Sequence, residues 1–215
     1  METRFFVRSV SKWRGYSYRW NDAGTDGALL DTSATAVYDV VVDGAPAQHQ
    51  HYFPTRSECL RCHPREAGSA IGTQTLQMNR DFDYGGVVDN QIRALNHAGY
   101  FDRDVSNDLS HLDALPLPTD ESLPIETRVR ANLHANCSHC HQPAGTATSA
   151  LVRDMRYPTA LADTSICPQV VPGHPETSNF WQQISSISMP PIAVFTLDPR
   201  LDVVRQWITD MTSCP

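Results

Sequence analysis

The sequence CSHCH at residues 137–141 places two cysteines three positions apart, with a histidine directly after the second. The same pattern occurs earlier as CLRCH at residues 59–63. These two stretches contain four of the six cysteines in the 215-residue chain. The other two, Cys167 and Cys214, are each followed by proline. The fold must therefore position two C-x-x-C-H stretches, and their chemistry is the strongest indication of function in the sequence.

This pattern is the attachment signature of c-type haem. Two thiols one helical turn apart can each add to a vinyl group of the same porphyrin, and the adjacent histidine can supply an axial nitrogen to the iron. The sequence therefore predicts two covalently bound haem c groups. The predicted anchoring cysteines are Cys59, Cys62, Cys137 and Cys140, and the predicted axial histidines are His63 and His141.

A C-x-x-C pair also occurs in zinc sites and in thioredoxin-like dithiols. Here 74 residues separate Cys62 from Cys137, which is outside the spacing of short zinc ribbons, and no βαβ pattern surrounds either pair. A zinc- and disulfide-stabilised binding module without haem nevertheless stays as an alternative. It predicts a colourless protein with stoichiometric zinc.

The second haem has a candidate sixth ligand in Met189, which precedes two prolines and lies 48 residues beyond His141. Prolines restrict the backbone of such a loop, so less entropy is lost when the thioether sulfur is held at the iron. Ligation by histidine and methionine raises the reduction potential. Met155 and Met211 have no such loop and are predicted to be core residues.

The sixth ligand of the first haem is open. Met78 lies only 15 residues beyond His63 and is the nearest soft ligand, while His51, His97 and His111 are alternatives. A vacant sixth position is a further alternative. It would make the protein a dihaem peroxidase-like enzyme.

The two remaining cysteines, Cys167 and Cys214, are expected to form a disulfide, since leftover cysteines in an oxidising compartment most often pair. The alternative is two free, buried thiols. The bridge would close a loop of about 47 residues near the end of the chain.

The composition excludes several classes of protein. The formal charge is −7, and 16 arginines and the single Lys12 form no evident basic stripe, so a nucleic-acid binder is not expected. No apolar run of 18 or more residues is present, so no membrane span is expected. The first ten residues do not resemble a secretory signal. Because covalent haem attachment requires export, the chain is interpreted as mature or truncated, and as periplasmic or extracellular.

The chain divides into three predicted parts. Residues 1–48 are a β-rich module with strands near 4–8, 16–20 and 36–42, and residues 49–118 are the first haem-binding segment. Residues 119–215 form the second haem-binding segment, and a connector rich in proline and aspartate at 107–124 marks the boundary between the two segments.

Helical periodicity is clearest in the last part. Ile125, Val129, Leu133 and Cys137 recur every four residues, which places the second motif on an apolar face and directs His134 and His139 away from the iron. A final helix is predicted with Asp198 as N-cap and Pro199 as its first residue. Its apolar stripe is Leu201, Val204, Trp207, Ile208 and Met211. A shorter amphipathic helix is predicted for 87–95, ending near Gly99.

The residues also resemble a known family. Residues 127–211 resemble a class I cytochrome c domain, and residues 2–211 resemble a group of bacterial dihaem c-type cytochromes. The matching stretches include 2–4, 18–21, 54–63, 77–80, 90–92, 135–141, 171–178 and 188–191. The resemblance implies haem ligation by His63, His141 and Met189. Because similar modules occur fused or adjacent to PQQ-type sugar dehydrogenases, it also implies a redox enzyme as partner.

These observations lead to one expected fold and function. The fold is expected to be mixed: a small N-terminal β module followed by mainly α-helical haem-binding segments, the last a class I cytochrome c-like domain. The protein is expected to carry single electrons between a redox enzyme and another carrier, such as a second cytochrome. A neighbouring subunit in an assembly is a further possible source of the sixth ligand of the first haem.

Overall fold

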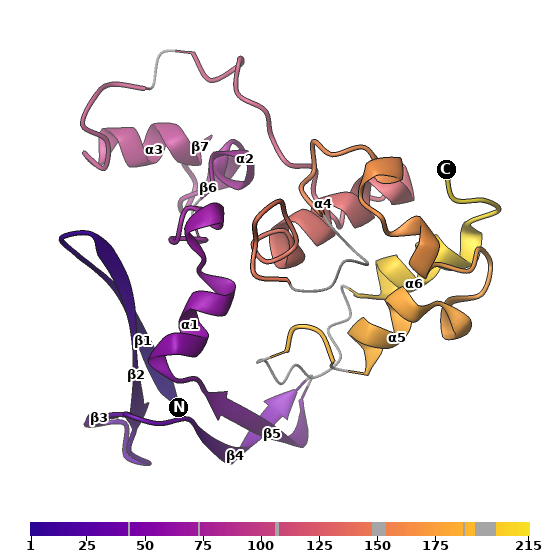
Figure 1. Cartoon of the computed structure of the whole chain (residues 1–215). Helices are drawn as coiled ribbons and strands as arrows, with labels where there is room; N and C mark the ends of the chain where they lie inside the picture. Colours follow the sequence, from indigo (N-terminus) through magenta and orange to yellow (C-terminus); the bar gives the residue numbers. More distant parts are fainter. Residues whose placement is uncertain (43, 73, 106–107, 148–153, 187, 192–200) are drawn as a thin grey trace.

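The computed structural model in Figure 1 describes all residues of the chain except 43, 73, 106–107, 148–153, 187 and 192–200. Its N-terminal part consists of β-strands. Strands β1 (Glu2–Ser9) and β2 (Lys12–Trp20) form an antiparallel hairpin, and β3 (Gly27–Leu29) pairs with the end of β2. A second hairpin joins β4 (Ala34–Val42) to β5 (Ala45–Phe53). Strand β5 therefore continues past residue 48, where the β-rich module was expected to end. Aromatic and β-branched residues favour strands, and the three strands predicted here are confirmed.

The first motif lies on a short helix directly after the second hairpin. Helix α1 (Arg56–Cys62) begins with a capping box, in which the Thr55 hydroxyl accepts from the Glu58 N–H and the Glu58 carboxylate accepts from the Thr55 N–H. A 3₁₀ turn, Arg65–Ala67, and helix α2 (Thr75–Met78) follow. The hairpin of β6 (Asp81–Asp83) and β7 (Val88–Asn90) then leads into α3 (Gln91–His97).

The helix predicted for residues 87–95 starts later in the structure and is preceded by a strand. Residues 88–90 form strand β7, and the helix starts at Gln91 because the Asn90 side chain accepts a hydrogen bond from the Ile92 N–H at 2.9 Å. Asparagine is a favoured N-cap, so it separates strand from helix at this point. Ile92 is buried, and Gly99 follows the helix with φ of +77°.

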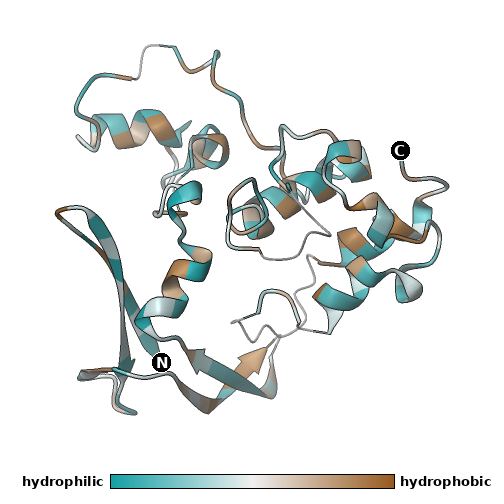
Figure 2. Ribbon diagram, viewed as in Figure 1, coloured by the Kyte–Doolittle hydropathy of each residue, from teal (hydrophilic) through white to brown (hydrophobic). Residues whose placement is uncertain are grey.

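The C-terminal part contains the main hydrophobic core. Helices α4 (Ile125–Cys137), α5 (Asn179–Ser185) and α6 (Asp202–Asp210) pack together, connected in part by 3₁₀ turns at Leu161–Asp163, Cys167–Gln169 and Pro175–Thr177. Figure 2 shows hydrophobic residues where these helices gather. The predicted stripe of the last helix is confirmed, since Val204, Trp207 and Ile208 are buried, while its predicted start at Asp198 and Pro199 lies outside the described residues. Within the described residues, no helix has the length and apolarity needed to cross a bilayer.

The expectation of mainly α-helical segments after the β module is wrong. Among the described residues there are six α-helices, and only α4 and α6 are longer than seven residues. Strands β5, β6 and β7, 3₁₀ turns and loops account for much of the rest. Proline and glycine explain the low helical content between α4 and α5, because proline removes a backbone donor and glycine disfavours helix. That stretch contains Pro143, Gly145, Pro158, Pro168, Pro172, Gly173 and Pro175.

A disulfide joins Cys167 to Cys214, the two cysteines that were expected to pair. Both pack against the core of α4, α5 and α6. The bridge therefore ties the end of the chain, just beyond α6, to a turn that lies 47 residues earlier.

Replacing both of these cysteines by serine is expected to lower the free energy of unfolding by about 3–4 kcal/mol, because the bridge restricts a long loop in the unfolded chain. Denaturant unfolding monitored by circular dichroism measures the change. Ser213→Ala, at the exposed residue next to Cys214, is the matched control and should change stability little. Equal stability of the double variant and the control would contradict the structural role of the bridge.

Candidate functional site

Helix α1 supplies both thiols of the first motif. Cys59 and Cys62 lie one turn apart and are half-buried, and the N–H of His63 donates to the Cys59 carbonyl at 3.0 Å. The Glu58 carboxylate also accepts from the Tyr52 hydroxyl at 2.8 Å, which anchors the helix to the end of β5. A rigid helical turn thus presents two thiols and, directly after them, an imidazole.

His63 is held in a defined orientation. Its Nδ1 lies 2.8 Å from the carbonyl oxygen of Ser69, and its ring lies 4.5 Å from that of Phe6 on β1. A carbonyl oxygen can only accept, so Nδ1 donates to it, and in the neutral ring Nε2 then keeps its lone pair. A histidine that ligates a metal through one ring nitrogen is usually oriented by a hydrogen bond of this kind at the other nitrogen.

Gly15 on β2 permits α1 to lie directly against the sheet. A Cβ at this position would come within 2.4 Å of the Cys59 Sγ and 2.7 Å of the Cys59 Cβ. These separations are far below van der Waals contact, so no other residue fits without moving the helix. The glycine therefore sets how closely the first cysteine approaches the β module.

Gly15→Ala is expected to displace α1 and to lower the free energy of unfolding by about 1–3 kcal/mol, the usual cost of overpacking. Gly27→Ala is the control in the same sheet, because its Cβ would meet the Tyr18 Cβ at 3.6 Å, an ordinary contact. Denaturant unfolding of the two variants gives the comparison. A Gly15→Ala protein no less stable than Gly27→Ala would show that α1 does not pack as described.

The second motif follows the same local plan at the end of α4. Cys137 is the last residue of the helix, and its carbonyl accepts from the N–H groups of Cys140 and His141 at 3.1 and 2.9 Å. Burial raises the pKa of the Cys137 thiol to about 12. The carbonyl of His141 accepts from the Met155 N–H at 2.9 Å, which fixes the backbone of the motif against the core.

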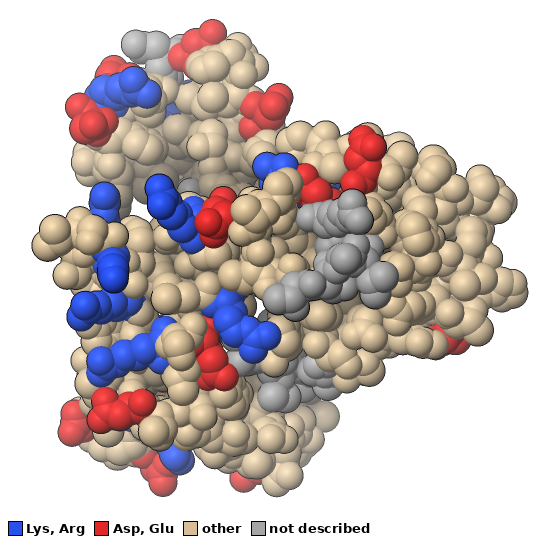
Figure 3. All heavy atoms as spheres, in the orientation of Figure 1, with Lys and Arg blue, Asp and Glu red and all other residues tan. Residues whose placement is uncertain are grey.

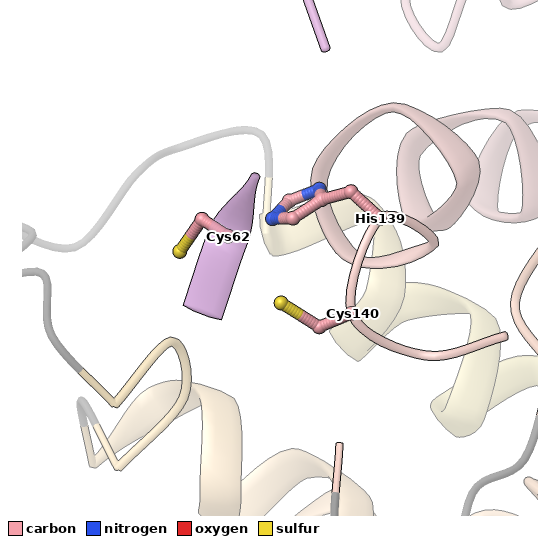
Figure 4. Close-up of side chains that lie close together, drawn as sticks. All are labelled: Cys62, His139 and Cys140. Carbon is pink, nitrogen blue, oxygen red and sulfur yellow. The ribbon is translucent and has the colours of Figure 1, made fainter. Parts of the chain in front are cut away.

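The two motifs meet at their second cysteines. The ligand atoms of Cys62, His139 and Cys140 all lie within 4.8 Å of one another, and Figure 4 shows the three side chains converging from two separate segments. The hydrogen bond between the thiols of Cys62 and Cys140 lowers the pKa of Cys140 and raises that of Cys62. The Cys140 Sγ also lies 3.1 Å from the Arg61 carbonyl oxygen.

The histidines beside the second motif lie in different surroundings. The His139 ring lies beside the thiols of Cys62 and Cys140. His134, in contrast, is buried, with 7% of its surface exposed. The Nε2 of His134 lies 3.0 Å from the Gln74 Oε1, and its Nδ1 accepts from the Tyr157 N–H at 3.2 Å. A neutral imidazole protonated on Nε2 satisfies both partners. His134 is thus a structural link between α4 and the segment of the first motif.

His134 should make stability depend on pH. Burial, and next the guanidinium of Arg156, hold the pKa of His134 below its ordinary value of 6.5, while Asp154 acts in the opposite direction. The folded state disfavours the protonated ring. The stabilisation that the neutral His134 gives to the folded state is therefore complete above the pKa of histidine in the unfolded chain, and it is lost as the pH falls below that value.

Denaturant unfolding at several pH values tests this contribution. Between about pH 7.5 and pH 5 the wild type should lose more stability than His134→Gln, a variant that keeps hydrogen-bonding groups but does not titrate in this range. Parallel pH profiles for the two proteins would contradict the assignment of His134 as a buried neutral residue.

The candidate sixth ligands are spread over the fold. Met78 is half-buried at the end of α2, and the Nε2 of His51 lies 2.6 Å from the Glu2 Oε2. His97 and His111 are exposed. Met189 is half-buried beyond α5, and its N–H donates to the Gln183 carbonyl at 3.0 Å. Ligation by any of these residues stays a prediction.

Three residues of the site were not predicted from the sequence. They are Phe6 and Gly15, which pack on the first motif, and Ser69, which orients His63. Only the start of α1 had a readable signal, the threonine and glutamate of the capping box at 55–58. The other contacts depend on how distant segments approach, which no local pattern records.

Comparison with protein-family models, with curated proteins and with solved structures gives no match to this chain.

Proposed function

We propose that the protein is a dihaem c-type cytochrome that carries single electrons between a redox enzyme and another carrier. The observation that carries the proposal is the convergence of two C-x-x-C-H stretches, 59–63 and 137–141, at the thiols of Cys62 and Cys140. Two covalently attached cofactors would therefore be anchored side by side. Adjacent redox centres are what a carrier needs to accept an electron at one side and release it at the other.

The residues present fit haem c. In each motif two thiols lie within one helical turn and the histidine follows directly, which matches attachment through two thioethers and one axial nitrogen. His63 has its Nδ1 engaged by Ser69 and its Nε2 available. Haem bound there supplies a one-electron couple of ferric and ferrous iron. The chain's own part is to anchor the ring, orient the imidazole and exclude water.

The distribution of buried residues also supports a cofactor near the first motif. Every member of the described hydrophobic cluster belongs to residues 125–214. Before α4, the buried hydrophobic residues among those described are Phe53, Ile92, Leu109 and Leu115, outside that cluster. A segment with so small a core generally depends on a covalent or metal-bound partner for stability. A porphyrin joined to Cys59 and Cys62 would serve that purpose.

The resemblance to bacterial dihaem c-type cytochromes supports the same proposal and extends it. We propose a periplasmic or extracellular location, because covalent haem attachment requires export. A PQQ-type dehydrogenase or another cytochrome is the proposed partner. Such partners would meet the chain through small, transient interfaces.

A structural metal site is the second candidate, because Cys62, His139 and Cys140 lie close enough to bind one ion. Thiolate and imidazole are the ligands of structural zinc, and an ion here would join α1 to the segment beyond α4. Among the described residues the group contains three ligands, one fewer than structural zinc usually takes.

His139 separates the two candidates, since it belongs to the three-residue group but anchors no haem. Protein purified from its native host should contain two irons and no zinc per chain, with the absorption spectrum of haem c. His139→Ala should keep both irons, whereas Cys140→Ser should lose the normal attachment at the second motif. One zinc per chain, lost in His139→Ala, would establish the metal site instead.

A further inference from the structure

The β1–β2 hairpin is the most basic part of an acidic chain. It contains five of the chain's 17 basic residues but only one of its 24 acidic residues. All five basic side chains are exposed: Arg4, Arg8, Lys12, Arg14 and Arg19. Figure 3 shows Lys and Arg gathered over the side of the molecule that carries β1, β2 and α1. The net charge of −7 conceals this local concentration, so the expectation of no basic stripe is wrong here.

Four of these charges are not neutralised within the described part of the chain. The acidic residue of the hairpin, Glu2, is buried and engaged by Arg4, the Ser17 hydroxyl and His51. No ion pair joins Arg8, Lys12, Arg14 or Arg19 to a described carboxylate. Their positive potential is therefore available to a partner.

The strand register places charge and apolar surface together. Opposed residues share a face, and the pairs Phe5–Tyr16, Val7–Arg14 and Ser9–Lys12 lie on the outer face. Phe5 and Val7 are 53% and 46% exposed, and Val10 at the turn is fully exposed. The hydrophobic colour at this turn is visible in Figure 2. Exposed aromatic and aliphatic groups bordered by cations are typical of a docking surface.

The opposite face of the hairpin contacts the first motif. Phe6 stacks on Trp13 at 5.1 Å and touches the His63 ring at 4.5 Å, and Gly15 lies against Cys59. A protein bound to the outer face would thus be separated from the first motif by a single β layer. The hairpin is the part of the chain that lies between solvent on one side and these motif residues on the other.

We infer that the outer face of the β1–β2 hairpin is the docking surface for an acidic redox-partner protein that exchanges electrons at the first motif. The inference rests on the proposed function. A protein partner fits better than an anionic membrane, because membrane-binding segments concentrate four to eight cations, whereas the outer face of the hairpin has two, Lys12 and Arg14. These two cations share that face with the exposed Phe5 and Val7.

The test measures binding, which requires no haem. A plant-type [2Fe–2S] ferredoxin serves as a strongly acidic one-electron probe, and calorimetry gives the Kd at low and at physiological salt. Lys12→Glu/Arg14→Glu should weaken binding by about tenfold or more at low salt and flatten its dependence on salt. Arg93→Glu/Arg205→Glu is the control, because it makes the same change in charge at exposed residues of α3 and α6 and should change the Kd less than about twofold.

Equal weakening by both double variants would overturn the inference, since only net charge would then matter. Binding of the wild type to phosphatidylserine vesicles as tight as to ferredoxin, lost in Lys12→Glu/Arg14→Glu, would also overturn it in favour of a membrane surface. The proposed function fails separately, by the absence of haem from the purified chain. A wild-type chain that carries both haems but does not bind ferredoxin therefore counts against the docking surface alone.

Discussion

Replacing Cys59 and Cys62 by serine is expected to remove one of two haems and to halve the iron content of the purified protein. A thioether cannot form at serine, so the first motif loses its covalent attachment. The second motif at the end of α4 keeps both thiols and its helical turn. The mass of the denatured chain should therefore show a single attached haem.

This measurement does not depend on folding, because covalent attachment is read on the denatured chain. Cys137→Ser/Cys140→Ser should give the same loss at the other motif. Cys167→Ser/Cys214→Ser is the matched control, since it removes two cysteines that pair with each other and should keep both haems. Two haems on the Cys59→Ser/Cys62→Ser chain would contradict attachment at the first motif.

Met189→Ala is expected to lower the reduction potential of the second haem by on the order of 100 mV or more, within the roughly 0.8 V range that axial ligands control. A thioether sulfur stabilises ferrous iron, so its removal favours the ferric state. The potential of the first haem should change little. A spectroelectrochemical titration resolves the two couples and also reports loss of the absorption band of an iron–sulfur bond.

Two other methionines act as comparisons. Met155→Leu changes a buried core residue and should leave both potentials nearly unchanged. Met78→Leu tests the first haem in the same way, and a lowered first potential would identify Met78 as its ligand. Unchanged potentials in Met189→Ala would remove Met189 from the site.

The sequence was sufficient for features that depend on local pattern. Enrichment in aromatic and β-branched residues predicted strands β1, β2 and β4, and the apolar stripe that includes Val204 and Ile208 predicted the buried face of α6. Both patterns are created by neighbours along one element. The pairing of Cys167 with Cys214 also needed only a count of the cysteines left outside the motifs.

Features that depend on tertiary approach were missed. Nothing local to 59–63 indicates that Gly15 lies against Cys59 or that the Ser69 carbonyl orients His63. The proximity of Cys62 to Cys140 arises from segments far apart in sequence. The helical content is lower than predicted for a different reason, because prolines and glycines disfavour helix between α4 and α5.

The intact mass of the wild-type chain, purified from its native host and denatured, tests the central claim most directly. Two covalently attached haems are predicted, one at Cys59 and Cys62 and the other at Cys137 and Cys140. A chain of unmodified mass would contradict the assignment as a c-type cytochrome.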